Sequence, residues 1–511
     1  METSKTSWLE RFLRKVEIAG NKLPHPWLFF VYLIAIVLAI AHFLDGVTFT
    51  IPGTEDVKTV VSLLNADGLR YMIENMVDNF INFPPIGLVI PVAIGVGICE
   101  HAGLFDAAIV KLVGSVPSSV ITAVFIFAAI NSNIASDARY AIIIPVGATL
   151  YLSLGRNPLL GIIAGYAGAS AALSCNLMIV GLDATLAGIT QKASQIIPHT
   201  TGALSHAACN WYFMIASTFL LTIVGTYVTE RVVAPMLEKD DKRTISSHAN
   251  HGNEIKISDE QQKGLKYAAI TFAIYMLLLL ILTVPAGALL RNPETGTILP
   301  KSPLMAGLIP IATVLFIAIG IAYGIGAKTI TSSHDIGKFM SKGVSTMSSF
   351  LVLAFFCAQF TDYFKVTNLA TYIAIVGANL LKSINLTGIP LLIIVVLFVS
   401  FINIFVGSST AKWAMLAPII VPMLGLLGYA PAFSQAIYRV GDSVTNTINP
   451  LSTYYPYVIA IMQKYDPDAG IGTTIAYQIP YAIFFMVFWT LLLVVWYYLG
   501  LPFGPGISAH L

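Results

Sequence analysis

Long apolar stretches recur along the chain and are separated by short segments that are polar or rich in Gly and Pro. A helix needs about 20 mostly apolar residues to cross the hydrocarbon core of a bilayer. Seven stretches are candidates for such helices: residues 27–44, 88–104, 211–235, 267–290, 304–323, 349–360 and 479–499. The hydrophobic pattern therefore predicts an all-α polytopic membrane protein.

Composition supports the same class. Of the 511 residues, 56% are hydrophobic and only 11% are charged, whereas soluble domains carry about 25% charged residues. A net charge of +2 without a basic stripe argues against nucleic-acid binding. The four cysteines lie far apart in apolar runs, so we expect buried hydrophobic side chains rather than disulfides or a zinc site: Cys99, Cys175, Cys209 and Cys357.

Basic residues predict the orientation of the chain in the bilayer. Residues 1–26 and the polar loop at 236–264 are both rich in Lys and Arg, which places both on the cytoplasmic side of a cell (inner) membrane. No small-residue cleavage site follows the first apolar run, so a signal peptide is not expected. His248 and His251 lie in the loop without Cys or carboxylate neighbours in a ligand pattern, and we expect no metal there.

Helix-breaking residues suggest an internal repeat. At a constant offset of 273 residues, positions in the first half match positions in the second: Pro145 with Pro418, Gly155 with Gly428, Pro158 with Pro431, Gly168 with Gly441 and Asn176 with Asn449. Shared Gly and Pro are informative in so apolar a chain, because they mark specific backbone requirements. The sequence therefore predicts two membrane halves, at residues 27–235 and 265–511.

Each predicted half contains a hairpin and then an interrupted helix. The hairpins lie at about 118–154 and 389–427, and the broken helices at about 158–189 and 432–456. Apolar runs of about 10–14 residues are too short to span easily and fit re-entrant segments. Non-helical backbone at membrane depth is tolerated only where protein buries it or water reaches it. Breaks in corresponding places of two halves indicate the binding site of a transporter.

Oxygen-bearing side chains gather at the second hairpin tip and in the second break: Asn403, Ser408, Ser409, Thr410, Asp442, Ser443, Thr445, Asn446 and Asn449. Carboxylate, amide and carbonyl oxygens suit Na⁺, and one Asp would neutralise one monovalent cation. Alternatively, these side chains only cap the ends of broken helices. For Asp442, which lies in an otherwise apolar segment, we favour a functional role.

Two further residues of the second half are candidates for substrate binding. Arg439 lies three residues before Asp442, so the two could form an internal ion pair; alternatively, its planar guanidinium could receive a substrate carboxylate. Trp413 offers a flat face to an aromatic ligand, or else packs or anchors at the interface. Lys412 and Arg139 hold equivalent positions in the two halves, and we expect both to reach toward the interface. Alternatively, they face the site and contact a ligand.

In the first half, Asn131, Ser136 and Asp137 lie at the hairpin tip, and Asp183 lies beyond the break. Carboxylates inside a membrane are functional candidates by default, although Asp183 could instead lie in a wet loop before the polar residues 191–200. A Walker A sequence is absent, so ATP is not expected to drive the protein. The sequence also lacks a motif that pairs a nucleophile with a base, so an enzyme is not expected.

Several separated segments together resemble the AbgT family of p-aminobenzoyl-glutamate transporters: residues 20–26, 136–137, 210–214, 407–413, 417–423, 439–446 and 500–506. The resemblance implies a homodimer in the lipid bilayer. Each protomer would have nine membrane helices and two re-entrant hairpins, and would move its substrate by an elevator motion.

The resemblance also implies site residues. It implies a substrate site near Asp183, Trp413, Pro431 and Arg439, and a Na⁺ site at Asn403, Asp442 and Asn446. No cofactor besides a coupling ion is expected. Family members are described as importers of p-aminobenzoyl-glutamate or exporters of sulfonamide antimetabolites. Both ligands contain a para-substituted aniline, which a Trp face could hold.

The sequence as a whole predicts a secondary active transporter of p-aminobenzoyl-glutamate, related aromatic carboxylates or sulfonamide-type antimetabolites, driven by a Na⁺ or H⁺ gradient. One alternative is a Na⁺-coupled dicarboxylate or citrate carrier of similar architecture, which would not need Trp413. Another is a channel or an intramembrane enzyme. The direction of transport and the coupling ion stay open at this point.

Overall fold

The computed structural model describes most of the chain: residues 26–51, 56–114, 120–135, 138–196, 205–238, 257–298, 302–345, 347–404, 406, 408–449, 452 and 454–511. The predicted cytoplasmic N-terminus and most of the loop at 236–264, with its two histidines, lie outside these residues, as do Ser136 and Asp137. A small antiparallel sheet pairs β1 (Thr48–Thr50) with β2 (Val57–Thr59). The described chain is therefore mostly, rather than entirely, helical.

Each of the seven apolar stretches overlaps a long helix of the structure. These helices are α2 (Pro26–Phe43), α4 (Pro84–Ala102), α10 (Trp211–Val228), α12 (Asp259–Thr283), α14 (Leu308–Gly326), α16 (Ser348–Val366) and α22 (Ile471–Tyr498). After α10 the chain continues through a π-helical turn (Thr229–Val233) into α11 (Ala234–Glu238). Within the described residues, four helical segments are long and apolar enough to cross a membrane, or six if two bent pairs each count as one span.

The fourth predicted span, residues 267–290, is wrong at both ends. Helix α12 starts earlier because Ser258 caps it, accepting a hydrogen bond from the backbone N–H three residues on. It ends at Thr283 because Pro285 follows and because Gly287 takes a left-handed conformation with φ of 74°. The apolar residues beyond Thr283 therefore belong to a loop.

Each half contains a matching series of helices. The first series is α6 (Ile121–Asn131), α7 (Ala138–Ser153), α8 (Pro158–Ala171) and α9 (Gly181–Ser194). The second is α18 (Gly388–Asn403), α19 (Ser409–Gly425), α20 (Pro431–Val444) and α21 (Tyr455–Met462), with a 3-10 turn at Asn446–Ile448. Helices α8 and α20 both contain 14 residues and both begin at a proline. The turns before them contain Gly155 and Gly428, whose φ angles are 67° and 88°.

The matched glycines inside α8 and α20 both allow a neighbouring helix to approach closely. A Cβ added to Gly168 would lie 2.7 Å from the Cβ of Ala129 on α6, and one added to Gly441 would lie 2.6 Å from the carbonyl oxygen of Val396 on α18. Each helix after the hairpin thus approaches the first hairpin helix too closely for any side chain. Residues that are 273 positions apart therefore meet the same backbone requirement in both halves, either close helix packing or a positive φ angle.

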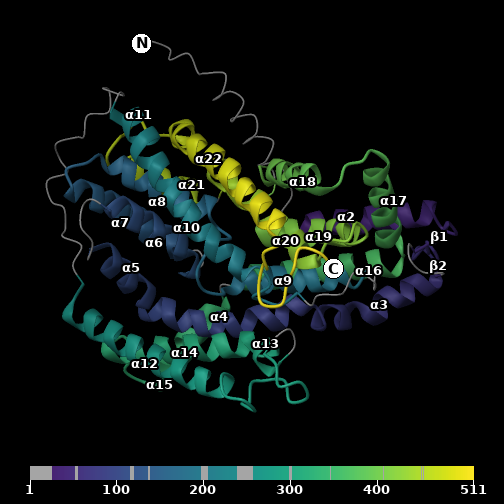
Figure 1. The fold of residues 1–511 in the computed structure, drawn as a ribbon, viewed down its shortest axis with the longest axis horizontal. Helices are drawn as coiled ribbons and strands as arrows, with labels where there is room; N and C mark the ends of the chain where they lie inside the picture. The colour runs from purple at the N-terminus through teal and green to yellow at the C-terminus, as the bar shows by residue number, and fades with distance from the viewer. Residues whose placement is uncertain are drawn as a thin grey trace, which may run out of the picture.

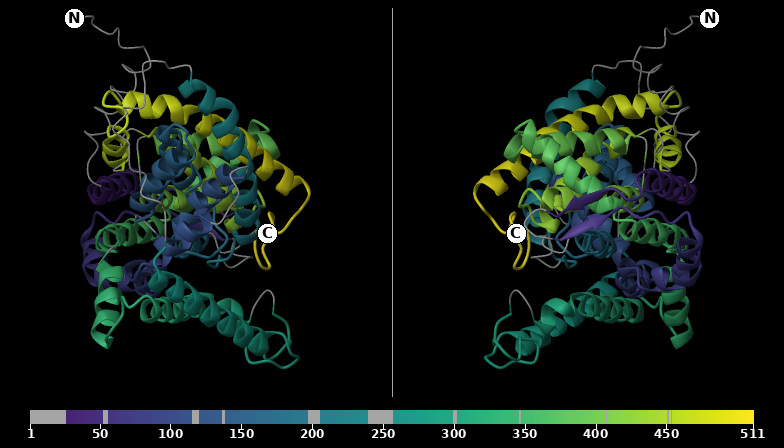
Figure 2. Two further views of the ribbon diagram at one scale, coloured as in Figure 1. Left: turned by 90° about the vertical axis from the view of Figure 1, so that its left-hand side faces the viewer. Right: turned by 90° about the vertical axis from the view of Figure 1, so that its right-hand side faces the viewer.

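Figure 1 shows α19, α20 and α9 in the interior, whereas α12, α14 and α15 (Ser333–Ser345) run along one side. In Figure 2 the layer made by α12 and α14 projects from the rest of the molecule. The remaining helices are α3 (Ala66–Ile81), α5 (Leu104–Gly114), α13 (Pro303–Ala306) and α17 (Leu369–Ser383).

Buried apolar side chains form a large cluster around the hairpins, α20 and α22, and a smaller one between α4 and α14. By contrast, α12 exposes many large apolar side chains, among them Ile274, Leu277 and Ile281. Such a surface suits contact with lipid. The polar breaks belong to the interior side of the molecule and not to this apolar surface.

Close packing of α7 on α8 generates a stability prediction. A Cβ on Gly161 would lie 2.0 Å from the carbonyl oxygen of Gly147, so Gly161→Ala must push the helices apart, and we expect a loss of about 1–3 kcal/mol. Gly87 in α4 has nothing within 4 Å of such an atom, and Gly87→Ala should leave stability unchanged or raise it. Thermal unfolding in detergent measures both; equal midpoints for the two variants would contradict the packing.

Candidate functional site

The two helix breaks of the chain meet in the interior. Helix α9 packs against both α19 and α20, and the 3-10 turn after α20 packs against α8. A direct link is made by Asn446, whose Nδ2 donates to the carbonyl oxygen of Ser170 at 3.3 Å. Polar backbone and side chains from both halves therefore face one another in a region that apolar side chains surround.

The first charged pair of this region joins the two halves. Arg439 Nη1 lies 2.6 Å from Asp183 Oδ1, and both side chains are at most 9% exposed. Asp183 stands in the first turn of α9, where its Oδ2 accepts the backbone N–H of Val180 at 2.7 Å. Asp183 is therefore buried and does not lie in a wet loop.

Of the two alternatives for Arg439, the ion pair with Asp442 is not formed, although the two residues are three apart on α20. The Arg439 guanidinium is directed to α9, where Asp183 accepts from it, and it also donates to the carbonyl oxygen of Ser174 at 3.4 Å. Asp442 is engaged by another helix, α19. Tertiary contacts thus separate two residues that helical spacing alone would pair.

A buried hydrogen-bond chain extends from Arg439 to Trp413. When the amide of Gln435 is oriented to satisfy its neighbours, its oxygen accepts from Arg439 Nε at 3.2 Å and its nitrogen donates to Thr190 Oγ1 at 2.7 Å. Trp413 Nε1 donates to the same Thr190 oxygen at 2.9 Å. Asp183, Arg439 and Trp413, predicted as substrate residues, therefore belong to one connected network.

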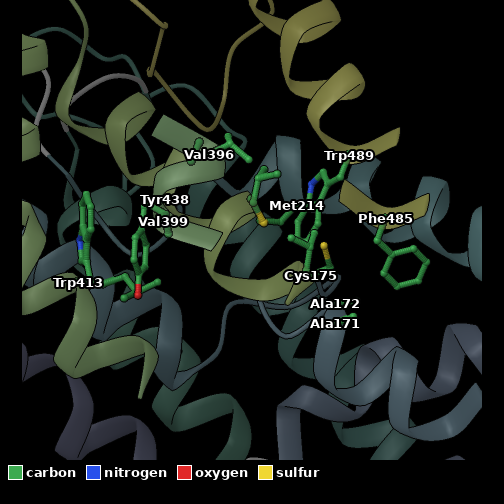
Figure 3. Packing of buried hydrophobic residues seen from close by; sticks show 14 of the residues in the cluster. Ala171, Ala172, Cys175, Met214, Val396, Val399, Trp413, Tyr438, Phe485 and Trp489 are labelled. Atoms are coloured by element: carbon green, nitrogen blue, oxygen red, sulfur yellow. The ribbon is translucent and has the colours of Figure 1, made fainter. Parts of the chain in front are cut away.

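The indole of Trp413 is fully buried and one of its faces is covered. Its ring stacks on Tyr438 with centroids 4.4 Å apart and an angle of 29° between the planes. Figure 3 shows the two rings side by side, with Val399 and Val396 of α18 nearby. An aromatic ligand could use the Trp413 face only after this stack opens.

Pro431, the fourth predicted substrate residue, lies apart from this network along α20. It is the first residue of the helix, eight residues before Arg439, which corresponds to about 12 Å along the axis. The residue before it, Ala430, donates its N–H to the carbonyl oxygen of Ala509 in the C-terminal segment. The structure therefore places Pro431 at the start of α20 rather than at the ion pair.

The second charged pair is formed by Asp442 and Lys412. Lys412 Nζ donates to Asp442 Oδ1 and to Asn403 Oδ1, and both charged side chains are fully buried. The expectation that Lys412 reaches the interface is wrong, because an acidic partner on α20 holds it inside. Arg139, at the equivalent position of the first half, is also buried and stacks over the ring of Tyr140 at 4.4 Å.

The other contacts of Asp442 come from neutral hydroxyl groups. Ser409, at the second hairpin tip, donates its Oγ to Asp442 Oδ2. The hydroxyl of Tyr438 lies 3.0 Å from Asp442 Oδ1 and 2.5 Å from the carbonyl oxygen of Ser409. Both carboxylate oxygens therefore have partners, and most of these come from the hairpin.

The three predicted cation ligands do lie together. Asn403 Nδ2 donates to the carbonyl oxygen of Asp442 at 2.6 Å and to Asn446 Oδ1 at 2.8 Å. A Na⁺ would need oxygens that are free to face it, yet Asn403 Oδ1 and Asp442 Oδ1 already accept from Lys412. As arranged here, these residues do not fit a bound Na⁺.

Two other tip residues that the structure describes, Ser408 and Asn131, have structural contacts. Ser408 caps α19, accepting from the backbone N–H of Ala411 at 3.3 Å, and Thr410 follows in the first turn. Asn131 closes the first tip over the first break, since its Oδ1 accepts the backbone N–H of Leu177 at 3.0 Å. The first contact favours the capping interpretation for Ser408, and the second shows that Asn131 binds the backbone of the first break.

Sequence reasoning missed Gln435, Thr190 and Tyr438. A signal was present for Gln435, because Gln435, Arg439 and Asp442 recur at helical spacing and form one polar face of α20. Thr190 gave no comparable signal, since a Thr inside a helix often bonds its own backbone, as Thr190 also does to the carbonyl oxygen of Leu186.

A cavity of about 560 Å³ lies elsewhere, beside the turn between α7 and α8. Arg156 and Glu230 at its wall form a two-pronged ion pair, with N–O distances of 2.7 and 2.8 Å. This partner raises the pKa of Arg156. The residues that line this cavity include none of the site residues predicted from the sequence.

Known proteins share both the sequence and the fold of this chain. A model of the AbgT putative transporter family matches residues 11–511. The p-aminobenzoyl-glutamate transport protein of Escherichia coli (strain K12) is 35% identical over 500 residues, which cover 97% of this chain and 96% of that protein.

Two solved structures are similar over nearly the whole chain. The crystal structure of the Alcanivorax borkumensis YdaH transporter superimposes with a TM-score of 0.88 at 36% identity and covers 94% of this chain and 100% of its own. Neisseria gonorrhoeae MtrF, described with a class of antimetabolite efflux pumps, gives a TM-score of 0.89 at 39% identity and covers 97% and 100%.

The buried pair of Arg439 and Asp183 generates a prediction on stability. Removing one partner leaves an uncompensated buried charge, which costs about 3–5 kcal/mol. Arg439→Gln and Asp183→Asn should therefore each lower the thermal midpoint strongly. The double variant should lose much less than the sum of the two.

The control is Arg70→Gln, because the pair of Arg70 and Asp67 is 71% and 91% exposed and should contribute little. Thermal midpoints of all four variants in the same detergent give the comparison. Strictly additive losses at Arg439 and Asp183 would mean that the two side chains do not interact in the folded protein.

Proposed function

Because the chain belongs to the AbgT family of transporters, we propose that it is a secondary active transporter of p-aminobenzoyl-glutamate or of related aromatic carboxylates and sulfonamide-type antimetabolites. It is a multi-pass membrane transporter and not an enzyme, since the family and the relatives named above are transporters. The substrate proposal rests on what one relative is named for and on the antimetabolite efflux ascribed to another.

The observation that carries the proposal is the buried chain from Asp183 through Arg439 to Trp413. It links a guanidinium, which recognises carboxylates through two parallel hydrogen bonds, through Gln435 and Thr190 to the indole N–H of Trp413. A ligand with both a carboxylate and an aniline ring has one partner for each. To bind, its carboxylate would replace Asp183 at Arg439, and its ring would replace Tyr438 at Trp413.

Opening of the second hairpin would give the ligand access. Ser409 and Lys412 on α19 fasten this hairpin to Asp442 on α20, so loss of these contacts releases the tip. The Trp413–Tyr438 stack joins the same two helices and would open with it. A movement of one hairpin could therefore expose both the charged and the aromatic parts of the site.

The wider architecture follows from the family resemblance. We propose two duplicated units in each protomer, nine membrane helices with two re-entrant hairpins, and a homodimer in the inner membrane with a cytoplasmic N-terminus. The equal lengths and offsets of α8 and α20 support the duplication. The units would slide against a scaffold, and a cation gradient, of Na⁺ or H⁺, would drive the movement because ATP-binding motifs are absent from the sequence.

Transport by purified protein in liposomes tests this function. Labelled p-aminobenzoyl-glutamate is followed while Na⁺, pH and substrate gradients are each imposed alone. Accumulation against a concentration gradient supports secondary active transport, whereas flux that stays downhill and does not saturate would indicate a channel. Trp413→Ala separates the two carrier classes, because a dicarboxylate or citrate carrier has no need of the indole and would keep its uptake.

Arg439 generates a prediction on specificity. Arg439→Lys retains the charge but loses the planar fork, so the apparent KM for p-aminobenzoyl-glutamate should rise about tenfold or more. A sulfonamide without a carboxylate makes no such contact, and its apparent KM should change by less than about twofold.

The matched control is Arg70→Lys, which alters an exposed arginine outside the site and should leave both values unchanged. Initial rates in proteoliposomes over a range of substrate concentrations provide the measurement. An equal rise for both ligands would show that Arg439 supports the fold of the site rather than recognition of the carboxylate.

A further inference from the structure

The ammonium group of Lys412 lies where the family resemblance implies a Na⁺. It contacts Oδ1 of Asn403 and Oδ1 of Asp442, which are two of the oxygens expected to bind the ion. Both Lys412 and Asp442 have no exposed side-chain area. The position is thus filled by a positive charge that belongs to the protein itself.

Two further hydrogen bonds engage the carboxylate of Asp442. Ser409 occupies Oδ2, and the Tyr438 hydroxyl approaches Oδ1 at 3.0 Å. Asn446 Oδ1, the third expected ligand, accepts from Asn403 Nδ2 at 2.8 Å. Each side-chain oxygen of the three expected Na⁺ ligands therefore already accepts a hydrogen bond from the protein.

The balance of buried charges also disfavours a bound Na⁺. Lys412 neutralises Asp442, and Arg439 neutralises Asp183, so the two pairs carry no net charge between them. A Na⁺ added to this arrangement would be a buried cation without a counter-charge, which is strongly unfavourable. A Na⁺ could enter only if Lys412 withdrew from Asp442.

Lys412 is held firmly in place on the second hairpin. Lys412 stands in the first turns of α19, where its N–H donates to the Ser408 carbonyl oxygen at 3.0 Å. Ser409 lies three residues earlier on the same face, so one side of α19 supplies a partner to each oxygen of Asp442. The second hairpin is thereby closed on α20 by a charge that cannot diffuse away.

We propose that the Lys412 ammonium is a tethered cation that takes the place of Na⁺ at Asp442, so that the protein transports its substrate without Na⁺. This inference rests on the proposed transport function and narrows its driving force to a gradient other than that of Na⁺. In a Na⁺-driven carrier the ion must enter and leave with each cycle, whereas Lys412 stays with hairpin 2 (α18 and α19) throughout.

Binding of Na⁺ to purified protein tests the proposal directly. Radioactive Na⁺ binding and thermal midpoints are measured in detergent, with choline replacing Na⁺ at constant ionic strength and pH. We expect no saturable Na⁺ binding and no Na⁺-specific rise of the midpoint for the unaltered protein. Saturable Na⁺ binding to the unaltered protein would overturn the proposal, whatever the variants do.

Lys412→Met provides the gain-of-response test. Methionine fills a similar space without charge and leaves Asp442 in need of a cation, so this variant should acquire saturable Na⁺ binding and a Na⁺-specific rise of its midpoint. The double variant Lys412→Met/Asp442→Asn should lose both. The control Lys111→Met, at an exposed lysine of α5, should behave as the unaltered protein does.

Transport provides a second measurement. Initial rates of p-aminobenzoyl-glutamate uptake by the unaltered protein should agree within about twofold in Na⁺ and in choline. Uptake by Lys412→Met should fall about tenfold or more in choline and recover in part in Na⁺. A well-folded Lys412→Met protein that responds to Na⁺ in neither measurement would refute the tethered cation.

The outcomes also separate this proposal from the function on which it rests. Should the unaltered protein move no p-aminobenzoyl-glutamate under any gradient, the proposed function fails, yet the Na⁺-binding results still decide on Lys412. Should Lys412→Met fail to fold, Lys412→Gln takes its place in the same assays, and the binding measurement on the unaltered protein remains decisive.

Discussion

Charged groups far from water must be paired, and this constraint organises the interior of the protein. Arg439 with Asp183 and Lys412 with Asp442 form two buried ion pairs. The first joins α20 to α9 of the other half, and the second joins α20 to α19, the helix before it. Neither pair is worth much net stability by itself, because desolvation of the ions offsets their attraction. Their value lies in fixing which helices meet, since any other arrangement would leave a buried charge alone.

The two halves contribute unequally to this centre, although their helices correspond. The first half supplies Asp183 and backbone carbonyl oxygens, whereas the second supplies Arg439, Lys412 and Asp442. A site assembled in this way changes whenever one half moves against the other. When such a movement separates an ion pair, each charge that stays buried needs a new partner. A substrate carboxylate could serve as the partner of a basic residue, and a cation as that of an acidic residue.

Sequence reasoning located the helix breaks and several members of the buried polar network, because Gly, Pro and lone acids inside apolar runs are rare and carry specific backbone or electrostatic requirements. It could not locate the pairings. Arg439 and Asp442 share a helical face, yet each pairs across the site, because the partner is chosen by packing between helices. Lys412 was misplaced for the same reason, since only the fold brings Asp442 within its reach. Similarly, the start of α12 depended on a cap and its end on a turn, and hydrophobicity alone marks neither.

The central claim is that the internal ion pairs occupy the positions that ligands take during transport. A structure determined experimentally with bound p-aminobenzoyl-glutamate tests it most directly. The account predicts the substrate carboxylate on Arg439, with Asp183 moved beyond hydrogen-bonding distance and the Trp413–Tyr438 stack opened around the aniline ring. A substrate bound elsewhere, with the Arg439–Asp183 pair and the stack both intact, would contradict it.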